Sequence, residues 1–264
     1  MKILVTNDDG IYAPGLWKLA EELSKIARVV IVAPDRERSA IGTAVSLHHP
    51  LRVQKVRSLL PRVETYSVEG TPADSVILAL SKLFEGKVDM VISGINQGQN
   101  LGEDVLISGT VGAALLGYLR GLPAIAVSAD GLDDLYLNDA AKFVALLAKK
   151  VVSSALPTNI FLNVNLPDLP LAEVGEIRIT RLGASSHVDT VEEGHDGKRA
   201  YYWLVRQKVN TQAEKKTDIW AINQGNISIT PLHIFWGNKI SPAVLNRLCS
   251  DLLQELKERK RVQK

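Results

Sequence analysis

The sequence has few features that would place it in a specialised class of protein. Cys249 is the single cysteine among 264 residues, which excludes an internal disulfide and fits a reducing compartment. No apolar run reaches the roughly 18 residues of a membrane-spanning helix, and the first strand is not preceded by a signal-peptide pattern. The formal net charge is only +2, so there is no strong electrostatic case for nucleic acid or membrane partners. We therefore expect a cytoplasmic protein that binds neither a membrane nor nucleic acid.

What the sequence does contain is an alternation of strand and helix patterns. The apolar runs Ile3–Val5 and Val29–Ala33 predict two buried strands, and leucines from Leu16 to Leu23 predict a helix between them. A strand, a helix and a strand within about 33 residues form a βαβ unit, which predicts parallel strands with a right-handed crossover. Further segments are typical of strands (45–47, 51–56, 64–68, 88–93, 123–127) and helices (72–83, 111–117, 138–152). This alternation predicts an α/β fold with a doubly wound, largely parallel sheet.

The pattern changes towards the carboxyl end. Strand-like segments at 160–166, 176–180, 201–205 and 227–230 follow one another without helices of normal length between them, and Asp196–Gly197 indicates a hairpin turn. We therefore expect one domain over 1–264, made of a main α/β core (about 1–174), an antiparallel β-hairpin extension (about 175–235) and a C-terminal helix (about 241–264). The basic end of that helix is explained by its dipole and by solvation; nucleic-acid contact is the weaker alternative.

Two adjacent acids leave the first strand. Asn7-Asp8-Asp9-Gly10 follows the buried run directly, and buried carboxylates are costly unless a cation or hydrogen-bond donors compensate them. Gly10 tolerates backbone angles that other residues avoid, so it allows the strand to break and both acids to face one target. A divalent-metal site is one interpretation. A turn and helix-cap cluster is the other, because Asn and Asp favour turns.

Polar segments follow two other predicted strands at the same edge of the sheet. They are Asp35-Arg-Glu-Arg-Ser39 and Ser93-Gly-Ile-Asn-Gln-Gly-Gln-Asn100. Ligands of open parallel sheets bind beyond the carboxyl ends of the strands, so Asp8, Asp9, Ser39 and Asn96 would form a set of oxygen ligands. Such a set suits magnesium or manganese. The five histidines are not at zinc-like spacing, and His48–His49 is more typical of a structural pair.

A glycine-rich run and a helix start form the second candidate element. Gly94–Gly102 is followed by Ser108-Gly109-Thr110 at the amino end of a predicted helix, where backbone donors and the helix dipole favour an anion. The run matches neither the P-loop nor the dinucleotide fingerprint, and tight turns with close helix packing explain it equally well. A metal beside an anion site nevertheless indicates a phosphate ester, which a metal could polarise.

Taken together, these segments resemble the SurE (survival protein E) family of nucleotidases. The similar segments are Ile3–Gly15, Ala33–Ser39, Ser93–Gly102, Ser108–Ala114 and Ser228–Leu232. The resemblance covers nearly the whole chain. It departs from the family pattern at Ile107, where members often have an aromatic residue, and at Leu115–Leu116, where an acidic residue is common.

The resemblance implies a fold, an activity and a set of site residues. It implies a Rossmann-like domain with a projecting β-hairpin, and homodimers or homotetramers built by exchanging C-terminal segments. It implies a 5′-nucleotidase: a metal-dependent phosphatase of nucleoside 5′- and 3′-monophosphates, and possibly of short polyphosphate. One Mg²⁺ or Mn²⁺ per subunit would be held by Asp8, Asp9, Ser39 and Asn96. Asp8 and Asp9 are the predicted catalytic residues, and the predicted phosphate and substrate contacts are Asn100, Ser108, Gly109 and Thr110. The alternative from another class is a non-catalytic nucleotide or metal sensor that uses the same pocket.

Overall fold

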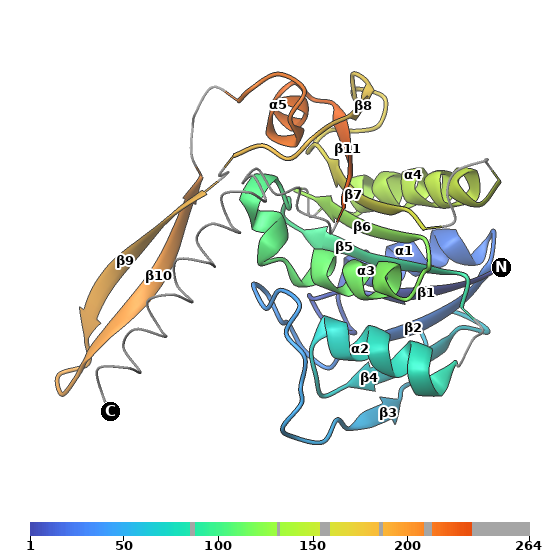
Figure 1. The fold of residues 1–264 in the computed structure, drawn as a ribbon, viewed down its shortest axis with the longest axis horizontal. Helices are drawn as coiled ribbons and strands as arrows, with labels where there is room; N and C mark the ends of the chain where they lie inside the picture. Colours follow the sequence, from blue (N-terminus) through green and yellow to red (C-terminus); the bar gives the residue numbers. More distant parts are fainter. Residues whose placement is uncertain (85–87, 131–132, 154–158, 185–186, 209–212, 234–264) are drawn as a thin grey trace, which may run out of the picture. The chain divides into compact units, whose positions relative to one another are not determined.

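The computed structural model describes residues 1–84, 88–130, 133–153, 159–184, 187–208 and 213–233. The strands are β1 (Lys2–Thr6), β2 (Arg28–Pro34), β3 (Val53–Lys55), β4 (Glu64–Val68), β5 (Met90–Gln97), β6 (Ala124–Ala129), β7 (Phe161–Leu166), β8 (Ile177–Ile179), β9 (His187–His195), β10 (Ala200–Lys208) and β11 (Ile227–Pro231). The helices are α1 (Pro14–Ser24), α2 (Pro72–Leu78), α3 (Gly109–Leu119), α4 (Asp134–Ser153) and α5 (Asp218–Asn223), with a π-helix η1 (Ala79–Leu83) and a 3-10 helix η2 (Gly102–Leu106) (Figure 1). The expected C-terminal helix over 241–264 lies outside the described residues.

The described strands form a nine-stranded sheet and a separate two-stranded hairpin. The order in the large sheet is β3-β4-β2-β1-β5-β6-β7-β11-β8. The run from β4 through β7 is parallel throughout, whereas β3 pairs antiparallel with β4 and β11 pairs antiparallel with β7. The predicted α/β class with a largely parallel sheet and an antiparallel hairpin is therefore confirmed. The chain moves outward from β1 to β2 and then returns to place β5 on the other side of β1, so the topological switch point lies between β1 and β5. Ligands of such sheets bind at the carboxyl ends of the strands there.

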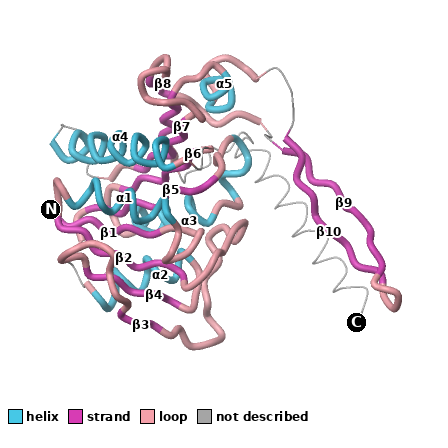
Figure 2. Tube along the Cα trace, turned by 180° about the vertical axis from the view of Figure 1, so that it is seen from behind, coloured by secondary structure: helices cyan, strands magenta, loops and turns pink. Residues whose placement is uncertain are grey.

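Helices cover both faces of this sheet because its central strands are apolar on both faces. Ile3 and Val5 of β1 pack into a core cluster with residues of α1 and α4, and Leu4 packs into a second cluster with residues of α2 and α3. All three side chains are fully buried, and burial of each contributes roughly 1.5–3 kcal/mol. Figure 2 shows these two helical layers, with α1 and α4 on one side of the strands and α2 and α3 on the other.

Glycines let α3 approach the sheet closely. A Cβ on Gly117 would lie 2.6 Å from a methyl group of Val91 in β5, and a Cβ on Gly112 would lie 2.4 Å from the carbonyl oxygen of Gly42. The small residues of this helix therefore account for its close packing. Its amino end is thereby fixed beside the carboxyl ends of β1 and β5.

The structure differs from the sequence-based expectation in two places. Residues 45–47 form no strand, because the backbone N–H and the hydroxyl of Ser46 both bond to the carboxylate of Asp74, at 2.9 and 2.8 Å, instead of to a neighbouring strand. The antiparallel extension is also narrower than 175–235. β8 and β11 join the large sheet, where β8 runs parallel to β11, and α5 lies between them in the chain. Of the strands that the structure describes, only β9 and β10 remain outside it.

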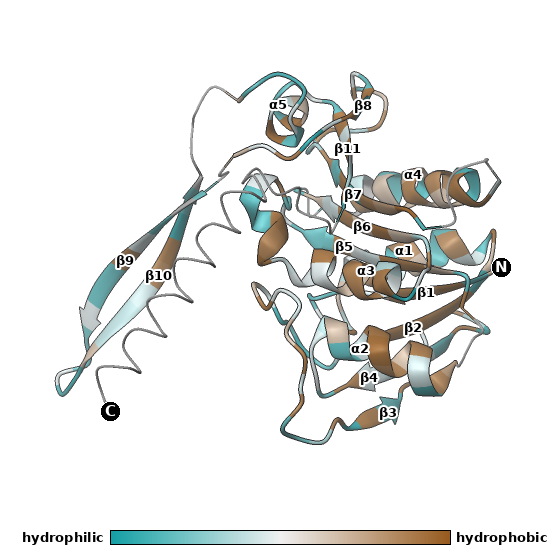
Figure 3. Cartoon of the chain, in the orientation of Figure 1, coloured by the Kyte–Doolittle hydropathy of each residue, from teal (hydrophilic) through white to brown (hydrophobic). Residues whose placement is uncertain are grey.

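The hairpin of β9 and β10 is antiparallel in continuous register from His187↔Lys208 to His195↔Ala200. Its turn is at the predicted Asp196–Gly197, where Gly197 has φ +92° and the carboxylate of Asp196 accepts N–H bonds from Lys198 and Arg199, both at 2.8 Å. Figure 3 shows the contrast in hydropathy between this hairpin and the mostly hydrophobic strands β1 and β2. Among the described residues, no helix has the length and apolar character needed to cross a membrane.

Candidate metal and phosphate site

The two acids occupy a turn that leaves the end of β1. Gly10 has φ +98°, and a Cβ there would lie 2.8 Å from the carbonyl carbon of Arg36, so only glycine fits without strain. The side-chain amide of Asn7 donates to the carbonyl oxygen of Gly10 at 3.0 Å and holds the turn. Asn7 and Gly10 thus have the turn role that the sequence suggested, while Asp8 and Asp9 lie between them with their carboxyl groups directed elsewhere.

Asp8 is buried against the amino end of α3. The hydroxyl of Thr110 donates to its Oδ1. A Cβ on Gly109 would lie 2.8 Å from the Cβ of Asp8 and 2.9 Å from its Oδ2, so the absence of a side chain there makes room for the carboxylate. Burial raises the pKa of Asp8, and the hydrogen bond from Thr110 opposes this only in part. The positive end of the α3 dipole favours the same carboxylate.

Asp9 lies beside Asp8 and the end of β5. The backbone N–H of Gln97 donates to its Oδ2 at 3.4 Å. Burial raises the pKa of Asp9 to about 7, and the negative charge of Asp8 adds to this effect. Two like charges in a partly desolvated site are unfavourable unless a cation compensates them. These are the electrostatics of a cation site.

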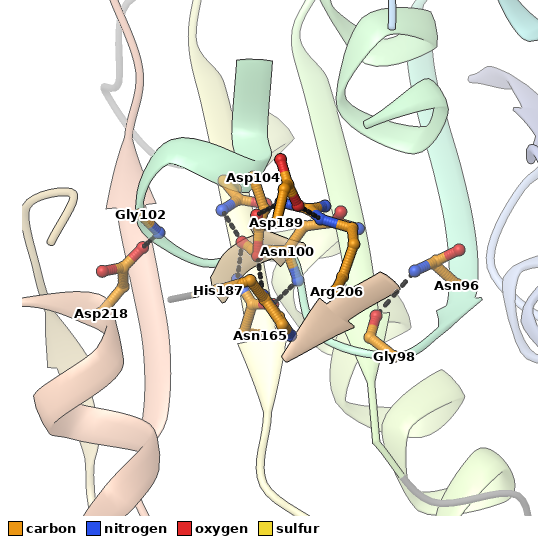
Figure 4. Close-up of polar contacts among 11 residues, drawn as sticks. Asn96, Gly98, Asn100, Gly102, Asp104, Asn165, His187, Asp189, Arg206 and Asp218 are labelled. Carbon is orange, nitrogen blue, oxygen red and sulfur yellow. Dashed lines mark hydrogen bonds and ion pairs between the residues drawn. The ribbon is translucent and has the colours of Figure 1, made fainter. Parts of the chain in front are cut away.

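Asn96 comes from β5, next to the position that contacts Asp9. The pairing of β5 with β6 shifts register between Ser93 and Asn96, an irregularity of the kind that re-aims side chains. The amide nitrogen of Asn96 donates to the carbonyl oxygens of Gly98 and Gln97, at 2.6 and 3.2 Å (Figure 4). Its nitrogen is therefore occupied, and its Oδ1 is the atom that can serve a metal.

Ser39 lies in the loop after β2, and this loop is tied to the acids by its backbone. The N–H of Arg38 donates to the carbonyl oxygen of Asp8 at 2.7 Å. The exposed hydroxyl of Ser39 donates to Oε1 of Glu37 at 2.7 Å, which leaves the hydroxyl oxygen with acceptor capacity. The charge of Glu37 also contributes to the raised pKa of Asp8 and of Asp9. Glu37 is a site residue that sequence reasoning missed, although it lies within the polar segment that was singled out.

The residues present fit a hard divalent cation. Two carboxylates, an amide oxygen and a hydroxyl offer oxygen alone, the donor type that magnesium and manganese prefer. Within the described ranges, no three or more His, Cys, Asp or Glu side chains form a metal-binding group. That finding is consistent with a set whose other two members are neutral oxygens.

The predicted phosphate contacts have different environments. Ser108 caps α3: its Oγ accepts the N–H of Val111 at 3.2 Å. Thr110 is fully buried and its hydroxyl is directed to Asp8. Gly109 presents backbone only, at a helix start where N–H groups lack partners within the helix. This helix end therefore meets the paired acids, with Thr110 linking the two.

Asn100 is buried in a network of amides. Its N–H donates to Oδ1 of Asn165 at 2.8 Å, its Nδ2 donates to the hydroxyl of Ser128 at 2.7 Å, and its carbonyl oxygen accepts from Asn163 and Asn165 (Figure 4). These bonds fix the loop after β5. A direct substrate contact of Asn100 stays a prediction.

Comparison with known proteins places the chain in a family. The model of the family described as "Survival protein SurE" matches residues 3–189. The chain belongs to the SurE family. It is 54% identical over 235 residues to the 5′-nucleotidase SurE of Dehalococcoides mccartyi (strain CBDB1), which covers 88% of this chain and 89% of the relative. It is 46% identical to the 5′-nucleotidase SurE of Moorella thermoacetica, in an alignment that covers 89% of this chain and 90% of the relative.

A solved SurE structure shows the same fold. The crystal structure of the SurE protein from Aquifex aeolicus superposes with a TM-score of 0.80 at 38% identity, covering 94% of this chain and 99% of that one. The family and the α/β architecture expected from the sequence are confirmed.

Proposed function

We propose that the chain is a metal-dependent phosphomonoesterase that converts nucleoside 5′-monophosphates, and also 3′-monophosphates, to nucleoside and inorganic phosphate. Membership of the SurE family makes it a 5′-nucleotidase, a phosphoric monoester hydrolase. The metal dependence, the 3′ activity and a possible action on short polyphosphate are parts of the proposal that go beyond this class.

One observation carries the proposal. Two adjacent acids with raised pKa values lie at the sheet's switch point: Asp8 is buried directly against the amino end of α3, and the half-buried Asp9 lies beside it. A cation would compensate the acids, and the helix end favours an anion. A phosphate ester is a substrate that requires both features side by side.

Asp8, Asp9, Ser39 and Asn96 would hold Mg²⁺ or Mn²⁺, one per subunit. When bound, the ion supplies charge compensation and Lewis-acid polarisation of the phosphoryl group. Glu37 orients the hydroxyl of Ser39, and the carbonyl groups of Gln97 and Gly98 orient the amide of Asn96. The ligands are thus aligned before any ion arrives, which reduces the cost of binding it.

The substrate phosphate would lie at the start of α3. The hydroxyl of Ser108 and the backbone N–H groups of Gly109 and Thr110 would donate to the phosphoryl oxygens, with the helix dipole adding favourable charge. Asp8 and Asp9 are the groups that would orient the attacking water and accept its proton. The water oxygen would form a bond to phosphorus as the ester bond breaks, and the proton taken up by the carboxylate would pass to the leaving oxygen, so that the nucleoside leaves as the alcohol and the carboxylate is restored.

A substrate panel tests the function. Phosphate release should be measured with 5′- and 3′-mononucleotides, polyphosphate and a generic aryl phosphate, with Mg²⁺, Mn²⁺ and EDTA. We expect metal-dependent release from the mononucleotides and a loss of several orders of magnitude in Asp9→Asn. Near-normal turnover of Asp9→Asn at saturating metal would refute the assigned site.

The alternative is a sensor that binds nucleotide without turnover. It predicts measurable AMP or GMP binding with no phosphate release in the presence of Mn²⁺. Calorimetric binding measured beside the release assay distinguishes the two functions, because only the enzyme releases phosphate.

The proposal also includes assembly. The protein would act as a homodimer or homotetramer built with exchanged C-terminal segments. Exposed apolar residues on the hairpin support association: Tyr202, Trp203 and Leu204 are 62, 66 and 78% exposed.

A further inference from the structure

The segment from Asn100 to Ser108 joins the two halves of the proposed site. It begins four residues after Asn96 and ends at the cap of α3. Its first residue is fixed by β6 and β7, through Ser128, Asn163 and Asn165. Most of its remaining residues form η2. The position of η2 is held by contacts with parts of the chain that are far away in the sequence.

The start of η2 is held by the chain around Gly183 and by α5. The N–H of Gly102 donates to Oδ2 of Asp218 at 2.8 Å, while the N–H of Gly183 donates to Oδ1 of the same carboxylate at 2.7 Å. A Cβ on Gly102 would lie 2.0 Å from the carbonyl oxygen of Ala184. η2 therefore packs tightly on the stretch of chain that precedes the hairpin.

The middle of η2 is held by the hairpin itself. The buried carboxylate of Asp104 lies 2.7 Å from Nδ1 of His187 in β9 and 2.7 Å from Nη2 of Arg206 in β10 (Figure 4). The Nε of Arg206 donates to Asp189 at 2.8 Å, which fixes the guanidinium on its own hairpin. Side-chain exposure of Asp104 is only 8%, so these charge-assisted bonds are little screened by water.

The same aspartate holds the start of α3 through its backbone. The carbonyl oxygen of Asp104 accepts the N–H of Ser108 at 3.0 Å and that of Ile107 at 3.1 Å. One residue thus contacts the hairpin with its side chain and the phosphate-binding helix end with its main chain.

We propose that His187 and Arg206 are positioning residues for substrate phosphate: through Asp104 they hold Ser108 and Gly109, at the start of α3, in the conformation that binds phosphate. This rests on the proposed function, in that the phosphate binds at this helix start. The hairpin is then part of the active-site architecture as well as a projecting arm.

The physical reason lies in the desolvated carboxylate. If Arg206 loses its charge, Asp104 is left with weaker compensation in a water-poor place, and the free energy is lowered by a shift of η2 towards solvent. The carbonyl group of Asp104 moves with η2 and no longer fixes the backbone of Ser108, so the hydroxyl of Ser108 and the adjacent N–H of Gly109 lose their alignment. The proposed metal ligands lie in the turn after β1, in the loop after β2 and in β5, outside this segment. Thr110, which bonds to Asp8, is fully buried in α3 and keeps its place through that bond, so metal affinity should change little.

The test compares Arg206→Gln, Arg206→Lys and His187→Asn with the wild type. Arg178→Gln is the matched control, because Arg178 forms a 2.7 Å ion pair with Glu176 on the surface of β8 and its neighbour. Calorimetry gives the Kd of inorganic phosphate in Mn²⁺ and, separately, the Kd of Mn²⁺, and steady-state assays give KM and kcat for AMP. We expect Arg206→Gln to raise both the phosphate Kd and the KM about tenfold, which is about 1.4 kcal/mol.

The other variants make the test specific. Arg206→Lys keeps the charge, so its phosphate affinity should lie between those of Arg206→Gln and the wild type. His187→Asn keeps a donor near the position of Nδ1, so its phosphate affinity should differ little from that of the wild type. Mn²⁺ affinity, kcat and the Arg178→Gln control should stay within about twofold of the wild type. Light scattering on every variant records its oligomeric state.

Several outcomes would overturn the inference. Unchanged phosphate affinity in Arg206→Gln would do so, and so would a loss that accompanies dissociation of the oligomer or a loss of Mn²⁺ affinity. Absence of AMP hydrolysis in the wild type would refute the proposed function instead, and the phosphate Kd would then still test the role of Arg206.

Discussion

At the scale of single residues, Thr110 and Gly109 determine where the carboxylate of Asp8 lies. Gly109 leaves space for it and Thr110 donates a hydrogen bond to it. Because the hydroxyl is fully buried, it is better placed to orient Asp8 than to reach a substrate. The proposed metal site would thereby depend on a residue of α3 as well as on the strand ends.

We therefore predict that Thr110→Val lowers Mn²⁺ affinity about tenfold, whereas Thr110→Ser retains it. Loss of a hydrogen bond to a charged group costs about 1.5–3 kcal/mol, and valine has nearly the shape of threonine without its donor. Titration calorimetry of the metal gives the result without any assay of turnover. Equal Mn²⁺ affinity in the valine and serine variants would contradict this role.

The raised pKa of Asp9 leads to a prediction on stability. Its folded-state pKa of about 7 exceeds the ordinary 3.8, so the folded protein binds this proton more tightly than the unfolded chain. The free energy of unfolding of the metal-free protein must then fall as the pH rises from 3.8 to about 7. Asp9→Asn removes this partly desolvated charge, so in EDTA it should raise Tm at pH 8 and raise it much less at pH 5.

Calorimetric scans in EDTA and in Mn²⁺ check this result. The metal should stabilise the wild type at pH 8 and should stabilise Asp9→Asn far less. If the difference in Tm between the two proteins were the same at pH 5 and pH 8, the carboxyl group would not carry the partly desolvated charge that the structure assigns to it.

The sequence was informative about residues whose chemistry is local. Asp8, Asp9, Ser39 and Asn96 follow recognisable strands, and the topology of a parallel sheet places such residues at one edge. The contact of Thr110 with Asp8 spans 102 positions and that of Arg206 with Asp104 also spans 102. No spacing rule connects residues so far apart, because the contact depends on the packed positions of η2, α3 and the hairpin.

At the scale of elements, the start of α2 shows how a capping residue can determine the path of a loop. Thr71 and Asp74 form a capping box, and the fully buried carboxylate of Asp74 also accepts both donors of Ser46. The apolar pattern at 45–47 is typical of a strand, but bonding to the helix cap overrides it. The segment 72–83, in contrast, is helical as predicted, because its Thr-Pro start and its apolar spacing are local signals. It forms α2 as far as Leu78 and continues as the π-helix η1.

We predict that Asp74→Ala lowers the free energy of unfolding by about 3 kcal/mol, from loss of the cap and of the bonds to Ser46. Glu69→Ala is the control, because its ion pair with Arg52 is exposed and should contribute no more than about 1 kcal/mol. Urea unfolding followed by circular dichroism measures both. A similar loss in the two variants would contradict the assigned role of Asp74.

At the scale of the whole molecule, the hairpin is distinguished by the apolar side chains that it exposes. A two-stranded hairpin alone is marginally stable in water, and neighbouring residues of β10 alternate between its two faces. Tyr201 and Trp203 lie on one face, where their rings pack edge to face with centroids 6.4 Å apart, while Tyr202 and Leu204 lie on the other face. Exposure of apolar residues on both faces favours burial against further copies of the chain.

We accordingly predict that Leu204→Glu lowers the oligomeric state. Leu204 is 78% exposed, and a charge there would oppose its burial at an interface. Leu59→Glu is the matched control, since Leu59 is 71% exposed on a loop of the main sheet. Light scattering after gel filtration should give a dimer or tetramer for the wild type and the control, and a smaller species for Leu204→Glu. An unchanged mass for Leu204→Glu, or a monomeric wild type, would exclude the hairpin from assembly.

Because Arg206 lies two residues further along the same face, the activity of the smaller species would also show whether assembly and phosphate binding are coupled through Asp104.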